Sequence, residues 1–102
     1  MTYREEFPDF DPATMPLIPA GWQDISWHND TCPSFEAGKV HVFIDYADMS
    51  RREVQGGGRF LIVRPDDQEV LLIADDWNVV LLFVRGFENG IEFMKRGSEP
   101  CA

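Results

Sequence analysis

The most chemically varied side chains of this sequence lie in two short stretches, residues 27–32 and 45–48. The first stretch (WHNDTC) combines an imidazole, a carboxylate and a thiol, and the second (DYAD) has two carboxylates three residues apart. Such groups can ligate a metal ion or exchange protons with a substrate. An exposed tryptophan beside acids can instead anchor a basic protein partner. The candidate binding residues are therefore Trp27, His28, Asn29, Asp30, Asp45, Tyr46 and Asp48.

Neither stretch completes a metal or catalytic motif. The chain has two histidines and two cysteines, without the paired short spacings typical of a zinc site. A nucleophilic Cys32 would need a neighbouring base, and His28 lies across a predicted boundary between strand and loop. The alternative function is a small-molecule-binding or metal-binding domain, or a hydrolase-type enzyme. It requires four side chains to converge in one pocket, those of His28, Asp30, Asp45 and Asp48. We expect no cofactor and favour a non-enzymatic role.

The charge of the chain restricts the class of partner. The net charge is −9; residues 1–50 carry 9 acids and 2 bases, giving −7, and residues 51–102 carry 9 acids and 7 bases, giving −2. Binding to nucleic acid or to an anionic membrane depends on lysine and arginine, so we expect neither. A protein partner, and a basic one in particular, is compatible with this charge.

The N-terminal residues predict an extended arm. Prolines at positions 8, 12, 16 and 19 are interspersed with acids, and prolines at this spacing forbid a regular helix. We therefore divide the chain into a Pro-rich acidic arm, residues 1–20, and a single α+β domain, residues 21–102. Residues 1–11 should be dispensable for folding, although the apolar side chains of the arm predict that part of it packs on the body or on a partner.

Alternating apolar residues and turn signals predict the secondary structure of the domain. Strands are expected at residues 21–29, 39–46, 59–64 and 69–74, with a hairpin turn at 65–68. Asp75 and Asp76 can cap a helix over residues 76–85 that ends before Gly86. Residues 76–96 could alternatively be one long helix or a hairpin that turns at Asn89-Gly90. The predicted fold is a four-stranded antiparallel sheet with one main C-terminal helix packed on one face.

The sequence also allows predictions about the cellular location of the protein and its association with further copies of itself. No apolar run approaches the ~20 residues that a membrane helix needs, and the acidic N-terminus lacks the apolar region of a secretion signal. We expect a cytoplasmic protein in which Cys32 and Cys101 are free thiols. Homo-oligomerisation through the exposed edges of a small sheet is compatible with the sequence.

The favoured function is protein binding without catalysis. No catalytic set is complete, and the acids are concentrated in the N-terminal half. Three tryptophans are more than so small a core is expected to bury. We therefore expect an inhibitor, an immunity-type protein or an accessory factor that binds its partner through an acidic face containing aromatic residues.

Overall fold

The structure is a computed structural model that describes residues 2–52 and 58–87. A helix over residues 77–87 follows the last strand, and is called the C-terminal helix below. The other elements are α1 (Tyr3–Glu6), the 3₁₀ turns η1 (Pro12–Thr14) and η2 (Met49–Arg51), and the strands β1 (Gln23–Asp24), β2 (Ser34–Ala37), β3 (Val40–Ile44), β4 (Phe60–Arg64) and β5 (Glu69–Ala74).

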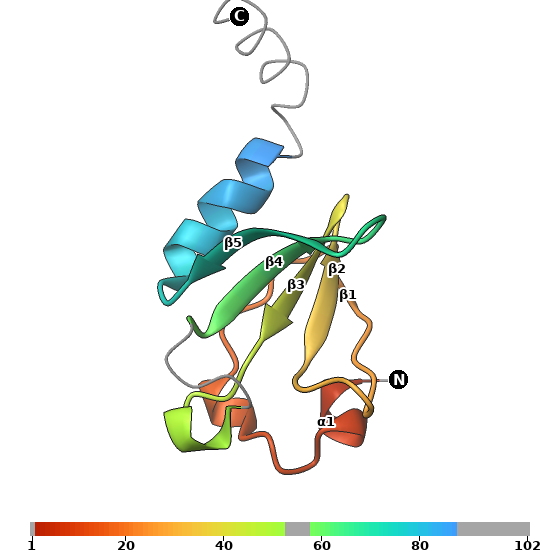
Figure 1. Cartoon of the computed structure of the whole chain (residues 1–102). Helices are drawn as coiled ribbons and strands as arrows, with labels where there is room; N and C mark the ends of the chain where they lie inside the picture. The colour runs from red at the N-terminus through yellow and green to blue at the C-terminus, as the bar shows by residue number, and fades with distance from the viewer. Residues whose placement is uncertain (1, 53–57, 88–102) are drawn as a thin grey trace, which may run out of the picture.

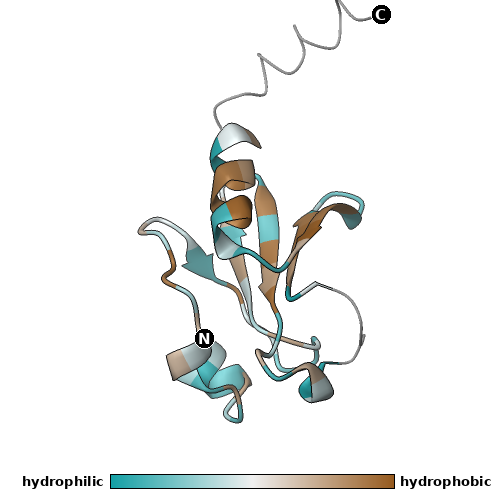
Figure 2. Ribbon diagram, turned by 90° about the vertical axis from the view of Figure 1, so that its left-hand side faces the viewer, coloured by the Kyte–Doolittle hydropathy of each residue, from teal (hydrophilic) through white to brown (hydrophobic). Residues whose placement is uncertain are grey.

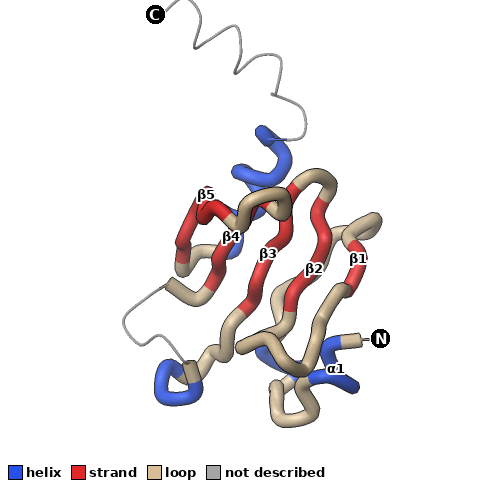
Figure 3. The backbone as a smooth tube through the Cα atoms, turned by 45° about the vertical axis from the view of Figure 1, so that its right-hand side comes forward, coloured by secondary structure: helices blue, strands red, loops and turns tan. Residues whose placement is uncertain are grey.

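The strands form one antiparallel sheet in which neighbours along the chain are neighbours in space, in the order β1-β2-β3-β4-β5 (Figure 3). The C-terminal helix lies against one side of β4 and β5 (Figure 1). The predicted α+β class and the C-terminal helix are thus confirmed, whereas the sheet has five strands instead of the predicted four. Among the described residues, no helix is long and apolar enough to cross a membrane.

The additional strand is β2, which occupies residues that were not predicted to form a strand. The strand expected at residues 21–29 is reduced to the two residues of β1, and β2 begins directly after Pro33. A two-residue turn at positions 38 and 39 then joins β2 to β3, because Ala37 pairs with Val40. Gly38 has a φ of 64°, which glycine adopts at little cost and which suits a tight hairpin.

The C-terminal helix begins as predicted but continues further. Asp76 caps it, since a carboxylate oxygen accepts the N–H of Asn78 at 2.9 Å. The prediction that Gly86 ends the helix is wrong, because residue 86 is helical and the described helix runs to Phe87. Phe87 packs against the core, one turn from Phe83 with a ring separation of 6.1 Å, and this packing outweighs the modest helix penalty of glycine. The predicted elements after Phe87 lie outside the described residues.

One face of the sheet is covered and forms the core. Hydrophobic residues occupy much of the C-terminal helix and of the strands beside it (Figure 2). The alternate residues of β3 that face this side are completely buried, and so is Ile62 of β4. The core consists of Phe7, Phe10, Phe35, Ala37, Val40, Val42, Ile44, Phe60, Ile62, Val80 and Val84.

The N-terminal segment contributes to this core. Phe7 and Phe10 are only 6% and 2% exposed, and Met15 and Ile18 pack against the same cluster. The prediction that part of the arm packs on the body is therefore confirmed. The segment is extended only in part, since α1 fits into the residues that precede the first proline. We predicted that residues 1–11 are dispensable for folding. Because Phe7 and Phe10 are core residues, we now expect deletion of residues 1–11 to destabilise the fold.

Replacing Phe10 by alanine should lower the free energy of unfolding by about 3–5 kcal/mol, the usual cost of removing a buried phenylalanine. Leu17→Ala is the control in the same segment, since Leu17 is 89% exposed, and should change stability by less than about 0.5 kcal/mol. Urea denaturation of both variants measures the difference. Equal stability of the two variants would show that the segment does not hold the core together.

Candidate functional site

In the part of the chain that the structure describes, the second face of the sheet is open and largely apolar. Along β3 and β4 the residues between the core positions point to this side, and they are His41 and Phe43 in one strand and Leu61 and Val63 in the other. Phe43 pairs with Leu61, and Leu61 pairs in turn with Ile73 of β5. Three neighbouring strands thus place a continuous row of apolar side chains on the open face.

A β-bulge adds a second row. Ile62 pairs with Leu72 and Val63 pairs with Val70, so that Leu71 is the extra residue of β5. The shift brings Val70 beside Val63 on the open face. It also pairs Arg64 with Glu69, and the two side chains form an ion pair at the end of the hairpin. The bulge therefore makes both ends of β5 contribute apolar side chains to this face.

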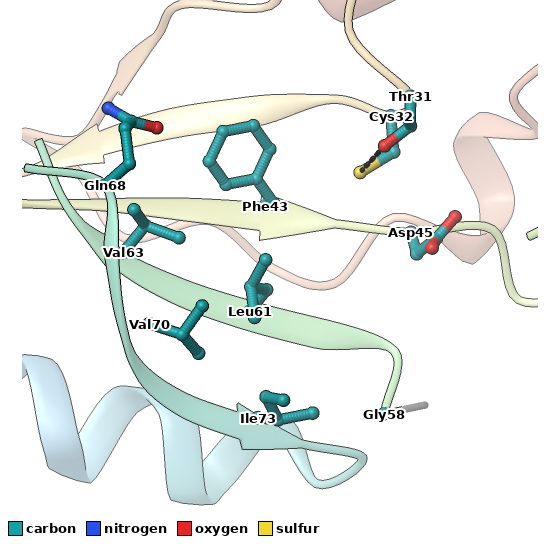
Figure 4. A pocket seen from close by; sticks show the side chains of 10 residues that line it. All are labelled: Thr31, Cys32, Phe43, Asp45, Gly58, Leu61, Val63, Gln68, Val70 and Ile73. Carbon is teal, nitrogen blue, oxygen red and sulfur yellow. Dashed lines mark hydrogen bonds between the residues drawn. The ribbon is translucent and has the colours of Figure 1, made fainter. Parts of the chain in front are cut away.

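These rows enclose a shallow hollow of about 460 Å³ (Figure 4). Phe43, Leu61 and Val63 come from the middle strands, while Val70 and Ile73 come from β5 (Figure 4). The complete lining is Thr31, Cys32, Phe43, Asp45, Gly58, Leu61, Val63, Gln68, Val70 and Ile73.

Gly58 forms part of the wall at its β5 end. A Cβ atom at this position would lie 2.7 Å from Cγ2 of Ile73 and 3.0 Å from the carbonyl oxygen of Ala74. The second contact is with backbone, which cannot move aside as a side chain can. The close approach of the chain to β5 therefore requires glycine here.

One end of the hollow carries a buried thiol next to negative charge. Cys32 is 3% exposed, and the hydroxyl of Thr31 donates a hydrogen bond to its sulfur at 3.8 Å. Burial is the main cause that raises the pKa of Cys32 to about 12. The negative charges of Asp45 and, to a smaller extent, Asp30 contribute in the same direction. The thiol is thus protonated at neutral pH and unsuited to nucleophilic attack. The two acids make this end of the hollow electronegative.

The first stretch of predicted site residues forms an exposed loop beside α1. Trp27 is 44% exposed, and its ring lies 4.2 Å from that of His28. Nδ1 of His28 lies 2.8 Å from a carboxylate oxygen of Glu6, and the backbone N–H of His28 donates to the same oxygen at 3.0 Å. The hydrogen bonds from His28 lower the pKa of Glu6. His28 thus fastens α1 to the loop that follows β1, and a pairing with Cys32, which the sequence did not favour, gains no support.

The second stretch is also tied to the N-terminal segment. The hydroxyl of Tyr46 donates to a carboxylate oxygen of Asp9 at 2.9 Å, and Arg51 pairs with Asp9 while lying 5.1 Å from the centre of the Tyr46 ring. Partial burial, followed by the hydrogen bond to Asp9, raises the pKa of Tyr46 to about 12. Asp48 caps η2 through the N–H of Ser50 at 3.0 Å. These residues make a structural contact between two segments.

The structure therefore divides the seven predicted residues among three places. Asp45 lines the hollow; Tyr46 and Asp48 line a smaller depression together with Asp9 and Arg51. The remaining four form the exposed loop at residues 27–30. No group of three potential metal ligands occurs within residues 2–52 and 58–87.

The residues that line most of the hollow did not stand out in the sequence, because none of them is chemically reactive. A signal was nevertheless present. Residues 60–63 and 70–73 are apolar at consecutive positions, so that both faces of these strands are apolar, although the chain is too short to cover both.

Comparison with known proteins adds no constraint on the function. No protein family, curated protein or solved structure matches this chain at a significant level. The functional argument therefore depends on the chemistry of the surface itself.

The state of Cys32 can be tested by its reactivity. In a Cys101→Ser variant, where Cys32 is the remaining cysteine, an aromatic disulfide reagent at pH 8 should label the folded protein at least tenfold more slowly than the urea-unfolded chain. The expected cause is burial, which keeps the thiol protonated and inaccessible. Equal labelling rates in the folded and unfolded protein would contradict the geometry of this end of the hollow.

Proposed function

We propose that this protein is a small acidic binding domain that docks a basic protein partner on the open face of its sheet and carries out no catalysis itself. The observation that carries this proposal is the apolar hollow with its electronegative end. Val70 and Ile73 remain 49% and 57% exposed there. Apolar side chains gathered in this way on a small protein are typical of an interaction site.

The composition of the hollow favours a macromolecular partner. Its middle is formed by an aromatic ring and branched aliphatic side chains, and its polar residues Thr31, Asp45 and Gln68 stand at the margin, as in the apolar centre and polar rim of protein interfaces. A partner side chain that enters the hollow would contact Phe43 and Leu61 on a rigid sheet, which costs little conformational entropy on binding. A binding surface of this kind would suit an inhibitor, an immunity-type protein or an accessory factor.

The charge of the protein supports a basic partner. Asp30 and Asp45 both act on Cys32 in the lining, so a lysine or arginine next to an apolar side chain of the partner would meet negative charge at this end. With a net charge of −9, the protein would also attract a basic partner over a distance before contact.

The enzymatic alternative has less support. Its four candidate groups occupy different surroundings, with His28 bound to Glu6 and Asp48 bound to Ser50. Asp45 is the member of the set that lines the hollow, and the neighbouring thiol has a raised pKa. A general acid or base needs a second group within hydrogen-bonding reach of the same substrate atom.

The test is to capture the partner from a native lysate, identify it, and measure association kinetics with the purified pair. The on-rate should fall about tenfold or more as salt rises from 0.05 to 0.5 M, since exposed charges are screened beyond about 8 Å at physiological ionic strength. The double variant Asp30→Asn, Asp45→Asn should slow association severalfold and leave the melting temperature nearly unchanged.

The matched control is Asp11→Asn, Asp48→Asn, which removes the same charge at the separate depression. Both acids cap 3₁₀ turns, and asparagine is an equally good cap. This control should slow association less than the first pair. An on-rate that changes neither with salt nor with either pair of substitutions would refute the proposal. Turnover of a small substrate that is abolished by His28→Ala would replace it with the enzymatic alternative.

A further inference from the structure

The two edges of the sheet differ in how they are closed. β1 is two residues long, and the Asp24 carboxylate accepts the N–H groups of Tyr3 and Ser26 at 2.7 and 3.0 Å. The N-terminal segment is therefore attached to that edge strand through the Asp24 side chain. β5 is six residues long and, within the described part of the chain, pairs with β4 alone. Its outer side presents the backbone N–H and C=O groups of alternate residues, which is a template for another strand.

Apart from the bulge at Leu71, the middle of β5 lacks the usual protection of an exposed edge. Proteins place lysine or proline on such strands to prevent pairing. Residues 70–74 of β5 contain neither, and Val70 and Ile73 are about half exposed. Both side chains also line the hollow, so the free edge and the apolar hollow form one continuous surface (Figure 4). The bulge at Leu71 turns Val70 into this surface.

Acidic residues bracket this apolar edge. Asp66 and Asp67 lie in the turn before β5, and Asp75 and Asp76 follow its last residue. Arg64 compensates part of the charge at the first end through its contacts with Asp67, whose pKa falls to about 2. At the second end, the carboxylates of Asp75 and Asp76 accept hydrogen bonds from the uncharged backbone N–H groups of Arg59 and Asn78. A strand of six residues separates the two acidic pairs by roughly 20 Å.

We propose that the partner adds an extended segment to the outer edge of β5 as a sixth strand. The segment carries apolar side chains at alternate positions and a lysine or arginine near each end. Its backbone would pair with β5, and its apolar side chains would extend the row that Ile73 begins on the open face. This inference rests on the proposed binding function and specifies its recognition mode.

Charge decides between such a partner and a second copy of this chain. A two-fold antiparallel pairing of two β5 edges would place the turn with Asp66 of one copy beside Asp75 of the other. It would do so at both ends, between two molecules that each carry a net charge of −9. Like charges directly opposite one another oppose strand pairing. A cationic extended segment instead meets opposite charge at both ends.

The probe is a synthetic eight-residue peptide with blocked ends, in which alternating valine and threonine stand between two terminal arginines. Two isomers of it carry N-methyl groups on either the odd or the even inner amides. Antiparallel or parallel edge pairing uses the amides of alternate residues, so one isomer should keep the affinity of the parent and the other should lose about tenfold or more. Fluorescence anisotropy with the full-length protein measures the three affinities.

Matched variants locate the site. Ile73→Lys should weaken binding of the peptide about tenfold or more, whereas Leu82→Lys makes the same change of charge at a comparably exposed apolar residue of the C-terminal helix and should have little effect. Asp66→Asn, Asp75→Asn should weaken binding more than Asp11→Asn, Asp48→Asn. Circular dichroism confirms that each variant is folded.

Equal affinities of the two methylated isomers, or no binding of any of the three peptides at millimolar concentration, would overturn strand addition. A concentration-dependent dimer that Ile73→Lys abolishes would assign the edge to a second copy instead. Strand addition can fail while the proposed function stands. A partner captured from the lysate whose binding depends on Asp30 and Asp45, but which does not compete with the peptide, would leave the proposed function intact and refute strand addition.

Discussion

The rest of the structure depends on the burial of one sheet face by side chains from both ends of the chain. Phe7 and Phe10 arrive from the N-terminal segment, and Val80 and Val84 from the C-terminal helix, to cover the completely buried residues of β3 and β4. Each such side chain contributes about 1.5–3 kcal/mol when it leaves water. The described segments before and after the strands are both used for this purpose, and within residues 2–52 and 58–87 the second face of the sheet stays open.

The polar residues that look most reactive in the sequence mainly serve this same packing. Glu6 holds the loop that contains His28, Asp9 binds Tyr46 and Arg51, and the Asp24 carboxylate accepts the N–H of Tyr3. Each contact joins the N-terminal segment to the sheet and thereby keeps its phenylalanines in the core. A histidine, a tyrosine and several acids of the sequence therefore take part in docking the N-terminal segment on the sheet.

Function, in our proposal, falls to the surface that folding leaves unused. The open face offers apolar area, a free strand edge and an electronegative margin, and none of these is needed to stabilise the core. Such a surface would expose the molecule to self-association, but the acids at both ends of β5 oppose pairing between identical copies. The same charges favour a basic partner, so solubility and selectivity have one physical origin.

The sequence by itself determined the local elements and the α+β class. The alternation of residues 40–44, the turn at 65–68 and the Asp76 cap each depend on a few adjacent residues, and all three appear in the structure. The burial of Phe7 and Phe10 and the separation of the candidate acids depended on tertiary contacts instead. These features arise between residues far apart in the chain, such as Tyr3 with Asp24 or Asp9 with Tyr46. The hollow is the clearest case, because alternation predicts that strands have two faces, while only the packed structure decides which face is covered.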